Sequence, residues 1–291
     1  MPNSIELFKK YIDRLDLVYK QASLTSVLDG DSTLVKAGAN ANEIIIPKLS
    51  MDGLADYSRN DGYVKGNVTL TNETVKFNYD RGRKFSVDAM DNEETAGIAF
   101  AKLSSEFIRT KVVPEMDAFR FATYAGTDGI SKVDTGATLA DGNAVLAALV
   151  VAQSKMDEDE VPYDNRHLFI TPTLYNTVLA VDTTKSKDVM ASFAAVHKVP
   201  QSRFYTAIDL KDGTTGGEEA GGYVKNADGK EINFMIIHKP ALMQYPKHTV
   251  NKIITPQANQ ESDGWMFFYR AYGLADVYEN KLAGIYLHHK A

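Results

Sequence analysis

The sequence predicts an α+β protein in which an extended β-hairpin leads into one long helix. Three observations support this prediction. Residues 68–79 alternate polar and apolar side chains, residues 91–124 carry apolar side chains at helical spacing on two sides, and residues 265–272 form a long aromatic run. A polar two-stranded hairpin is marginally stable alone, and a helix with two apolar sides needs partners on both. We therefore expect this half of the chain to be completed by neighbouring copies of the same protein.

The composition is that of a globular, acidic protein. The 291 residues exceed the usual size of one core, which predicts two subdomains or one domain with extensions. Hydrophobic residues make up 44% of the chain, which indicates a globular rather than a disordered protein. Lys and Arg total 32 against 38 Asp and Glu, a net charge of −6. Because tight, sequence-independent binding of nucleic acid requires clustered cations, this balance argues against that function. The absence of cysteine excludes disulfide bonds, thiolate zinc sites and cysteine nucleophiles.

The sequence shows no pattern of a secreted or membrane protein. Residues 1–7 contain no basic region followed by an apolar run, so we expect no secretory signal. No apolar window approaches the ~20 residues of a membrane helix. We expect a chain that is made and used in a cytosol and has no membrane partner.

The first 80 residues are expected to contain an arm and a hairpin. Residues 5–21 have apolar side chains at three- and four-residue steps, which predicts a short amphipathic helix in an N-terminal arm; a helix packed on its own subunit is the alternative. Residues 43–47 read as a short strand ended by Pro47, and residues 52–66 as a loop. Residues 68–70 and 75–79 are predicted to pair as a hairpin around a turn at residues 71–74.

Asp91 is predicted to open the long helix, because Glu94 follows three residues later in the pattern of a capping box. The helical pattern continues to about Tyr124 and stops at Gly126. Pro114 should kink or divide this helix, since it lacks a backbone donor and clashes with the preceding turn. Helical spacing predicts two ion pairs on the helix, Lys111 with Glu115 and Asp117 with Arg120.

The remaining residues alternate between helices and strands. Asn143 is the expected cap of a buried helix over residues 144–156, and Thr171 with Pro172 the expected start of a helix that ends at Val181. A further helix is predicted over residues 187–197. Strands are predicted at residues 167–170, 204–208, 232–237, 250–254, 265–277 and 282–288, of which 265–277 is expected to be central or interfacial.

The sequence contains almost no signal for an enzyme. The six histidines form no metal-binding pair at helical spacing, and His288 and His289 would point to opposite faces of a strand. Residues 157–160 are all acidic and are interpreted as a solvated loop, and the glycine-rich residues 213–222 lack the Lys of a phosphate-binding loop. We predict no catalytic, cofactor-binding or metal-binding residue; a hydrolase that uses Ser and His is the opposing hypothesis.

A local basic cluster follows the predicted hairpin in this acidic chain. Arg81, Arg83 and Lys84 lie within four residues, and the acidic residues Asp88 and Glu93 follow closely. These five residues are our candidates for contacts between subunits. The alternative is a solvated, charged strand edge that discourages aggregation.

Several long strings of the sequence carry a resemblance to a known family. They are FKKYI (8–12), ANANE (39–43), IPK (46–48), MDGLADYSR (51–59), FNYDRGR (77–83), VDAMDNEET (87–95), FIRTKVVPE (107–115) and FITP (169–172). In these strings and in the order of its elements, the chain resembles the major capsid proteins of tailed bacteriophages with the Hong Kong 97 type fold. The resemblance covers nearly the full length and is greatest to coat proteins of phages that infect Gram-positive bacteria.

The resemblance implies a domain organisation for the chain. Residues 1–42 would form an N-terminal arm over an adjacent subunit, and 43–131 an extended loop and a peripheral domain with a spine helix. Residues 132–245 would form an axial domain around five- and six-fold axes. Residues 246–291 would supply peripheral-domain strands and a last strand that returns to the axial domain. The extended loop would lie across a neighbour, and we expect no isopeptide bond from Lys65 or Asn67.

The resemblance also implies the partners and the location of the protein. The chain would form pentamers and hexamers of an icosahedral shell around double-stranded DNA, which it would contact only non-specifically. A separate scaffolding protein and a portal are expected partners, and no cofactor is expected. The protein would be located in the virion capsid and be assembled in the cytoplasm of the bacterial host. The alternative is an encapsulin-like shell that encloses cargo enzymes, and genome context would distinguish the two.

Overall fold

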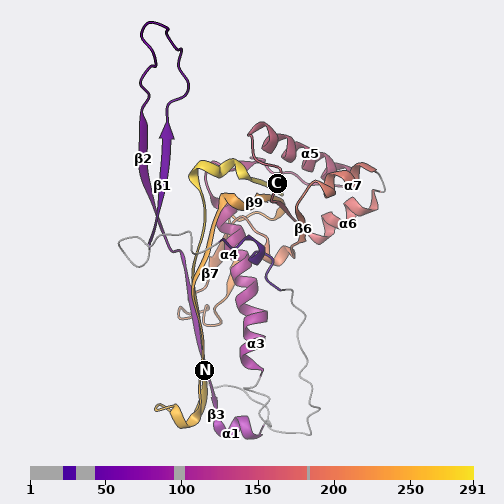
Figure 1. Ribbon diagram of the computed structural model, residues 1–291. Helices are drawn as coiled ribbons and strands as arrows, with labels where there is room; N and C mark the ends of the chain where they lie inside the picture. Colours follow the sequence, from indigo (N-terminus) through magenta and orange to yellow (C-terminus); the bar gives the residue numbers. More distant parts are fainter. Residues whose placement is uncertain (1–21, 31–42, 95–101, 182–183) are drawn as a thin grey trace.

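The computed structural model describes residues 22–30, 43–94, 102–181 and 184–291 of the chain (Figure 1). A two-stranded ribbon projects from one end of the body, and a three-stranded sheet extends to the opposite end beside a long helix. A five-stranded sheet with three helices on one side forms the widest part of the molecule. The predicted N-terminal helix over residues 5–21 lies outside the described residues.

The projecting ribbon pairs β1 (Glu43–Met51) with β2 (Val68–Lys76) in antiparallel register from Glu43–Lys76 to Met51–Val68. The predicted turn at residues 71–74 is wrong, because these residues continue β2 and pair with residues 45–48 of β1. The β-branched Thr71 and Thr74 suit a strand. The predicted end of the first strand at Pro47 is also wrong, because β1 continues to Met51. An edge strand tolerates proline, since some of its backbone N–H groups need no partner in the sheet. The loop predicted at residues 52–66 does lie at the tip of the ribbon.

The three-stranded sheet has β11 (Gly264–Val277) between β10 (Leu242–Ile254) and β3 (Tyr79–Asp88), and both pairs are antiparallel. The aromatic run is therefore the central strand, as predicted. One side of the sheet packs on the long helix through Phe267 and Tyr269, with the Phe85 and Phe107 rings 4.7 Å apart. β10 continues past residue 245 with a register shift between Pro246 and His248. The predicted domain boundary at residue 245 stays a prediction.

The long helix consists of α3 (Leu103–Phe107), a π-helical turn η3 (Ile108–Val112) and α4 (Val113–Gly126). It ends at Gly126, as predicted. Pro114 lies in the first turn of α4, directly after the π-helical turn, so the change of hydrogen-bonding pattern occurs where the proline removes a donor. Ahead of it, α1 (Ala89–Glu94) begins two residues before the predicted Asp91. Asp88 accepts a 2.9 Å hydrogen bond from the Met90 N–H and so caps α1.

The widest part of the molecule consists of β4 (Ser131–Lys132), α5 (Gly142–Glu158), β5 (Arg166–Ile170), α6 (Pro172–Ala180), α7 (Thr184–Ala191), β6 (Ala195–Lys198), β9 (Ile232–His238) and β12 (Ile285–His289). Its five-stranded sheet has the order β4-β12-β9-β5-β6. The outer helices α5, α6 and α7 pack on the face that carries Leu168 and Phe234, and the face that carries Phe169 and Met235 packs on Phe121 of α4. A small two-stranded sheet joins β7 (Ile208–Leu210) to β8 (Tyr223–Lys225).

Four predictions for this part need correction. Asp141, not Asn143, caps α5, and its carboxylate accepts a 2.8 Å hydrogen bond from the Ala144 N–H. α5 is buried on one side only, since Val151 is exposed. The helix predicted over residues 187–197 ends at residue 191, because residues 195–198 form the edge strand β6 beside β5. The strand predicted at residues 204–208 begins only at Ile208.

Five 3-10 turns complete the described fold. They are η1 (Ser26–Leu28), η4 (Gln201–Arg203), η5 (Lys239–Ala241), η6 (Pro256–Ala258) and η7 (Glu279–Gly284). Of these, η1 places Leu28 in the core beneath α4, so this part of the predicted arm packs on its own subunit.

His288 makes the stability of the five-stranded sheet dependent on pH. The side chain is 3% exposed, stacks on Phe234 at 4.9 Å and lies 3.1 Å from the Asn233 amide nitrogen, a donor that requires the neutral imidazole. Burial, and then the charge of His289, lower the pKa of His288 to about 4. The unfolded state therefore takes up a proton first, and stability falls as the pH drops from about 6.5 towards about 4.

We expect His288→Gln to reduce this loss of stability on acidification by on the order of 1–3 kcal/mol. Each unit by which folding lowers the pKa of the histidine corresponds to about 1.4 kcal/mol of stability, and partial solvation of the side chain reduces the effect. Chemical unfolding of unassembled subunits at pH 7 and pH 4 measures it. His248→Gln, at an exposed position on β10, should leave the difference unchanged. An unchanged pH dependence in His288→Gln would contradict the assignment.

Candidate intersubunit surfaces

One face of the projecting ribbon is apolar and uncovered. Leu49 pairs with Leu70 and Met51 with Val68, so these four side chains share one face, and all four are exposed. Beyond them, the loop at residues 52–66 exposes Leu54, Tyr57, Tyr63 and Val64. Thus eight of the sixteen exposed large hydrophobic residues in the described chain lie within residues 49–70. An apolar concentration of this kind marks an interaction surface.

The base of the ribbon is fixed to the body by a small core and by ions. Ile44 and Val75 are buried against Met243, Tyr245 and Leu274 of the three-stranded sheet. Beside this core, the Lys48 ammonium lies 2.8 Å from Glu73 on β2 and also pairs with Glu279 of η7. The hydrogen bonds to Glu279 and then to Glu73 raise the pKa of Lys48 above its ordinary value. Lys48 therefore links the ribbon to the body at the point where it begins to project.

We expect Lys48→Met to loosen the base of the ribbon, because Glu73 and Glu279 would then face each other without a cation. Backbone amides of residues 43–51 should exchange with solvent at least roughly threefold faster, since local opening becomes easier. Hydrogen-exchange mass spectrometry measures this, with Lys65→Met in the tip as the control. Equal exchange in Lys48→Met and the unchanged protein would contradict the role of Lys48.

A buried polar cluster fixes residues 22–30 on the body of the subunit. Asp117 of α4 forms an ion pair with Arg203 at 3.0 Å and accepts hydrogen bonds from both the N–H and the hydroxyl of Thr25. Ser23 and Leu24 also donate to the same carboxylate. The predicted helical pairs are therefore wrong: Asp117 pairs with Arg203, Arg120 pairs with Asp29, and Glu115 pairs with Arg81.

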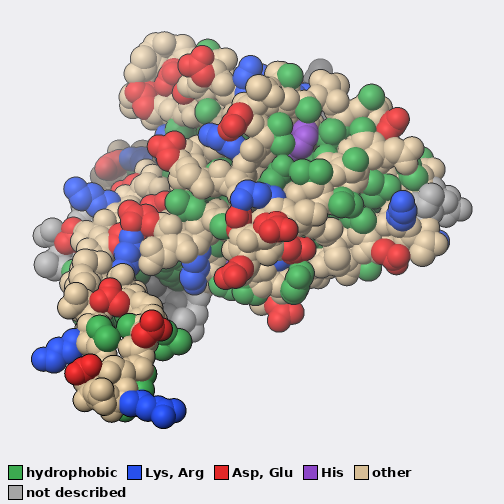
Figure 2. Space-filling model, turned by 90° about the horizontal axis from the view of Figure 1, so that it is seen from above, with side chains coloured by type: hydrophobic (Ala, Val, Ile, Leu, Met, Phe, Trp, Pro, Cys, Tyr) green, Lys and Arg blue, Asp and Glu red, His purple; other side chains and the backbone are tan. Residues whose placement is uncertain are grey.

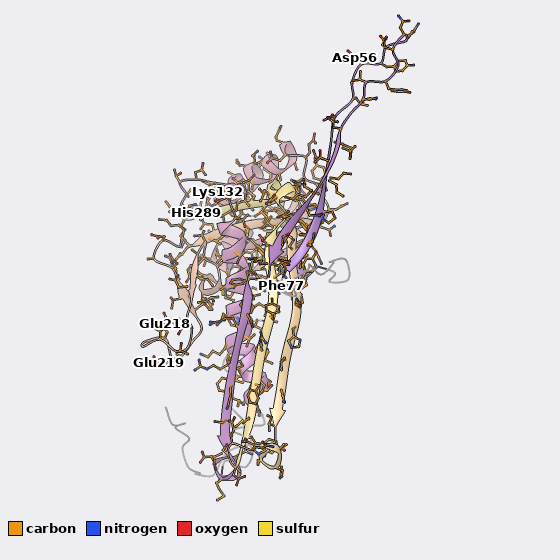
Figure 3. The ribbon with its side chains drawn as sticks, turned by 90° about the vertical axis from the view of Figure 1, so that its left-hand side faces the viewer. Asp56, Phe77, Lys132, Glu218, Glu219 and His289 are labelled. Atoms are coloured by element: carbon orange, nitrogen blue, oxygen red, sulfur yellow. The ribbon has the colours of Figure 1, made fainter. Side chains whose placement is uncertain are left out.

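The predicted basic cluster is divided between two faces of the three-stranded sheet, because side chains alternate along β3. Arg81 faces the long helix and pairs with Glu115 at 2.8 Å. Arg83 lies on the same side and donates to the Glu219 carbonyl at 2.7 Å, in the loop that Figure 3 shows beside the sheet. Lys84 points to the opposite side and pairs with Glu261 at 2.9 Å.

The two acidic candidates lie at the end of β3. Asp88 caps α1, and Glu93 belongs to α1, but its side chain lies outside the described part of the structure. Contacts between subunits through these five candidates stay a prediction.

A groove of about 950 Å³ lies between β3, the long helix and the segments at residues 202–205 and 211–225. Its lining combines aromatic and charged side chains, among them Phe85, Phe107, Glu115, Tyr205 and Tyr223. Burial, and then the charge of Glu115, raise the pKa of Tyr79 at its floor, so this phenol stays protonated. In the described ranges, no three His, Asp or Glu side chains are grouped to hold a metal ion.

Figure 2, which looks down on the end that carries the ribbon, shows acidic, basic and hydrophobic side chains intermixed over most of the described surface, with acidic side chains gathered on the lobe at the upper left. Among the described helices, none combines the length and the apolar character needed to span a membrane.

Comparison with known proteins identifies the fold. No protein-family model matches the sequence, and no curated protein is similar to it in sequence. A structure from Mycobacterium phage Che8 has 12% sequence identity and a TM-score of 0.66, covering 97% of this chain and 96% of that chain. The mature capsid of bacteriophage PhiM1 has 9% identity and a TM-score of 0.66, covering 98% and 92%.

A virus-like particle from Pyrococcus furiosus is also similar, with 13% identity, a TM-score of 0.51 and coverage of 85% and 86%. The chain therefore has the Hong Kong 97 type fold of tailed-phage capsid proteins, which confirms the fold that the sequence predicts.

Proposed function

We propose that the chain is a major capsid protein that assembles into an icosahedral shell around phage double-stranded DNA. The uncovered apolar face of the ribbon is the observation that carries this proposal. A lone subunit leaves Leu49, Met51, Val68 and Leu70 in water, whereas a neighbouring copy can cover them. The likeness to phage capsid structures supports a closed lattice of copies as the form in which that occurs.

Several weak contacts per subunit suffice for such a lattice. Each ribbon, arm or ion pair contributes a few kcal/mol at most, yet a subunit in a shell touches several neighbours at once, and multivalency multiplies the effect. The net charge of −6 supports the proposal that the inner surface of the shell contacts packaged DNA only non-specifically. Pentamers and hexamers, a separate scaffolding protein, a portal and assembly in the bacterial cytoplasm belong to the same proposal.

An encapsulin-like shell around cargo enzymes is the second candidate, supported by the likeness to the Pyrococcus particle. That likeness has a lower TM-score and covers less of this chain than the likeness to the two phage structures. We therefore prefer the phage capsid. The contents of the particle distinguish the two functions: nuclease-protected double-stranded DNA from infected cells, or co-purifying enzyme from uninfected ones.

Sedimentation and negative-stain electron microscopy of the overexpressed full chain, alone and with a co-expressed scaffolding protein, test the proposed function. We expect closed particles of uniform diameter. A chain that stays monomeric at every concentration and in both expressions would overturn the proposal. Histidine-to-glutamine substitutions made one at a time should leave particle formation intact, and hydrolase activity that disappears with one of them would favour an enzyme.

A further inference from the structure

The groove beside β3 carries a surplus of positive charge in an acidic chain. Its described lining residues include six cations and three carboxylates, a net charge of 6 − 3 = +3, whereas the whole chain has a net charge of −6. The cations are Arg81, Arg83, Lys102, Lys111, Lys211 and Lys225, and the carboxylates are Glu106, Glu115 and Asp212. The charge of the groove is therefore opposite in sign to that of the chain, which favours an acidic partner.

The three carboxylates of the groove are engaged by groups other than its lysines. Glu115 pairs with Arg81 at 2.8 Å, and Glu106 pairs with Arg109 at 2.6 Å. The Asp212 carboxylate accepts hydrogen bonds of 2.6–2.8 Å from backbone and hydroxyl groups of its own turn. The lysines of the groove therefore keep their charge available for a partner.

Three of these lysines lie on both sides of the groove. Lys111 belongs to the π-helical turn η3, and Lys211 and Lys225 lie in the segment on the other side. Lys111 and Lys225 are exposed, and Lys211 is half-buried. Within the described ranges of the chain, none of the three forms an ion pair. Carboxylates of a partner that lay along the groove could therefore pair with lysines on both sides.

The interior of the groove offers aromatic rings rather than further cations. The rings of Phe85 and Phe107 are 4.7 Å apart, and both side chains are half-buried, as are Tyr205 and Tyr223. These rings can cover the apolar side chains of a partner. The buried carboxylate of Glu115 would repel the phosphates of a nucleic acid at this depth. The lining therefore favours an acidic peptide over a polyanion.

The groove also reaches the backbone of β3. In the described sheet, β3 pairs with β11 on one side and with no strand on the other, so its free edge can accept a strand. Gly82 lines the groove although its side-chain position points to the opposite face of the sheet, so its backbone must be the part that lines it. Figure 3 shows the loop that carries Glu218 and Glu219 beside the sheet. An extended peptide fits such an edge.

We propose that the groove binds an extended acidic segment of a partner protein, in which acidic and apolar residues alternate. The apolar side chains lie on Phe85 and Phe107, the acidic side chains pair with Lys111, Lys211 and Lys225, and the backbone pairs with the free edge of β3. The site belongs to the single subunit and does not depend on the proposed shell function.

Fluorescence anisotropy with unassembled subunits of the full chain tests the site. The probe is a labelled peptide of the sequence Glu-Phe-Glu-Leu-Glu-Phe-Glu-Leu. A peptide of the same composition with its four Glu in one block tests the alternation, and a labelled oligothymidine tests a polyanion. The protein variant is Lys111→Glu/Lys225→Glu. Its matched control is Lys65→Glu/Lys252→Glu, which changes the charge equally at exposed positions outside the groove. Circular dichroism verifies that both variants are folded.

We expect the groove variant to bind the alternating peptide at least about tenfold more weakly, because two attractions become repulsions, and the control variant to bind it within about twofold of the unchanged protein. The block peptide should also bind more weakly. Carbodiimide coupling followed by mass spectrometry should join the carboxyl groups of the peptide to Lys111, Lys211 or Lys225, and not to Lys65 or Lys252.

Equal affinity of the two variants, equal affinity for the two peptides, or no binding of the alternating peptide up to about 1 mM would overturn the proposal. Tighter binding of the oligothymidine than of the peptide, lost in the groove variant, would assign the groove to a polyanion instead. Self-association of the subunits that is lost in the groove variant alone would assign it to a second copy of the chain.

Discussion

Replacing Asp117 with asparagine is expected to destabilise the subunit by about 3–5 kcal/mol. The carboxylate is fully buried, and its partner Arg203 is 2% exposed. The substitution keeps the shape of the side chain but leaves the guanidinium buried without a counter-charge, which is the costly way to break such a pair. The same carboxylate accepts hydrogen bonds from residues 23–25, so residues 22–30 should loosen as well.

Urea unfolding of unassembled subunits, followed by circular dichroism, measures this effect. The matched control is Asp80→Asn, which breaks the 2.6 Å pair between Asp80 and Arg270, whose side chains are 47% and 55% exposed. Solvent screens that pair, and its loss should cost at most about 1 kcal/mol. A cost for Asp117→Asn no larger than that of the control would show that the buried cluster does not hold residues 22–30 in place.

Replacing Leu70 with lysine is expected to abolish assembly and leave the subunit intact. Leu70 is 67% exposed on the apolar face of the ribbon, so the subunit should change in stability by no more than about 0.5 kcal/mol. In a shell, the neighbour that covers this face would bury an unpaired ammonium, which costs several kcal/mol at every copy. The yield of particles should fall at least about tenfold, since 1.4 kcal/mol already corresponds to that factor.

Particle yield by sedimentation, with circular dichroism of the unassembled fraction, measures this outcome. Thr69→Lys is the matched control, because Thr69 is the adjacent residue on the same strand and points to the opposite face. Normal yield for Thr69→Lys and loss for Leu70→Lys are expected. If the two variants assembled equally well, the apolar face would not be the surface that neighbours cover.

Elements with strong local signals could be predicted from the sequence. The aromatic run identified β11 as the central strand, and Gly126 identified the end of the long helix, because aromatic content and a glycine after a helical pattern act locally. The turn at residues 71–74 failed for the opposite reason. Those residues form a strand only because they pair with residues 45–48, and this pairing outweighs the local preference of Asn72 for a turn.

The ion pairs of the long helix could not be predicted for a similar reason, because their partners are distant in sequence. Asp117 and Arg120 have ideal spacing for a pair on one helix, yet Asp117 binds an arginine 86 residues away in sequence. Nothing in the sequence reports such a distance. The split of Arg81 and Arg83 from Lys84, by contrast, follows from the two-residue period of a strand and was available from the sequence.

The central claim is that the ribbon of each subunit is completed by a neighbouring copy, and cryo-electron microscopy of the assembled particle tests it most directly. We predict a closed icosahedral shell in which residues 49–70 lie against an adjacent subunit and Leu70 is buried. A particle in which these residues project into solvent at every symmetry-related position, or a protein that forms no particle under any assembly condition, would contradict it.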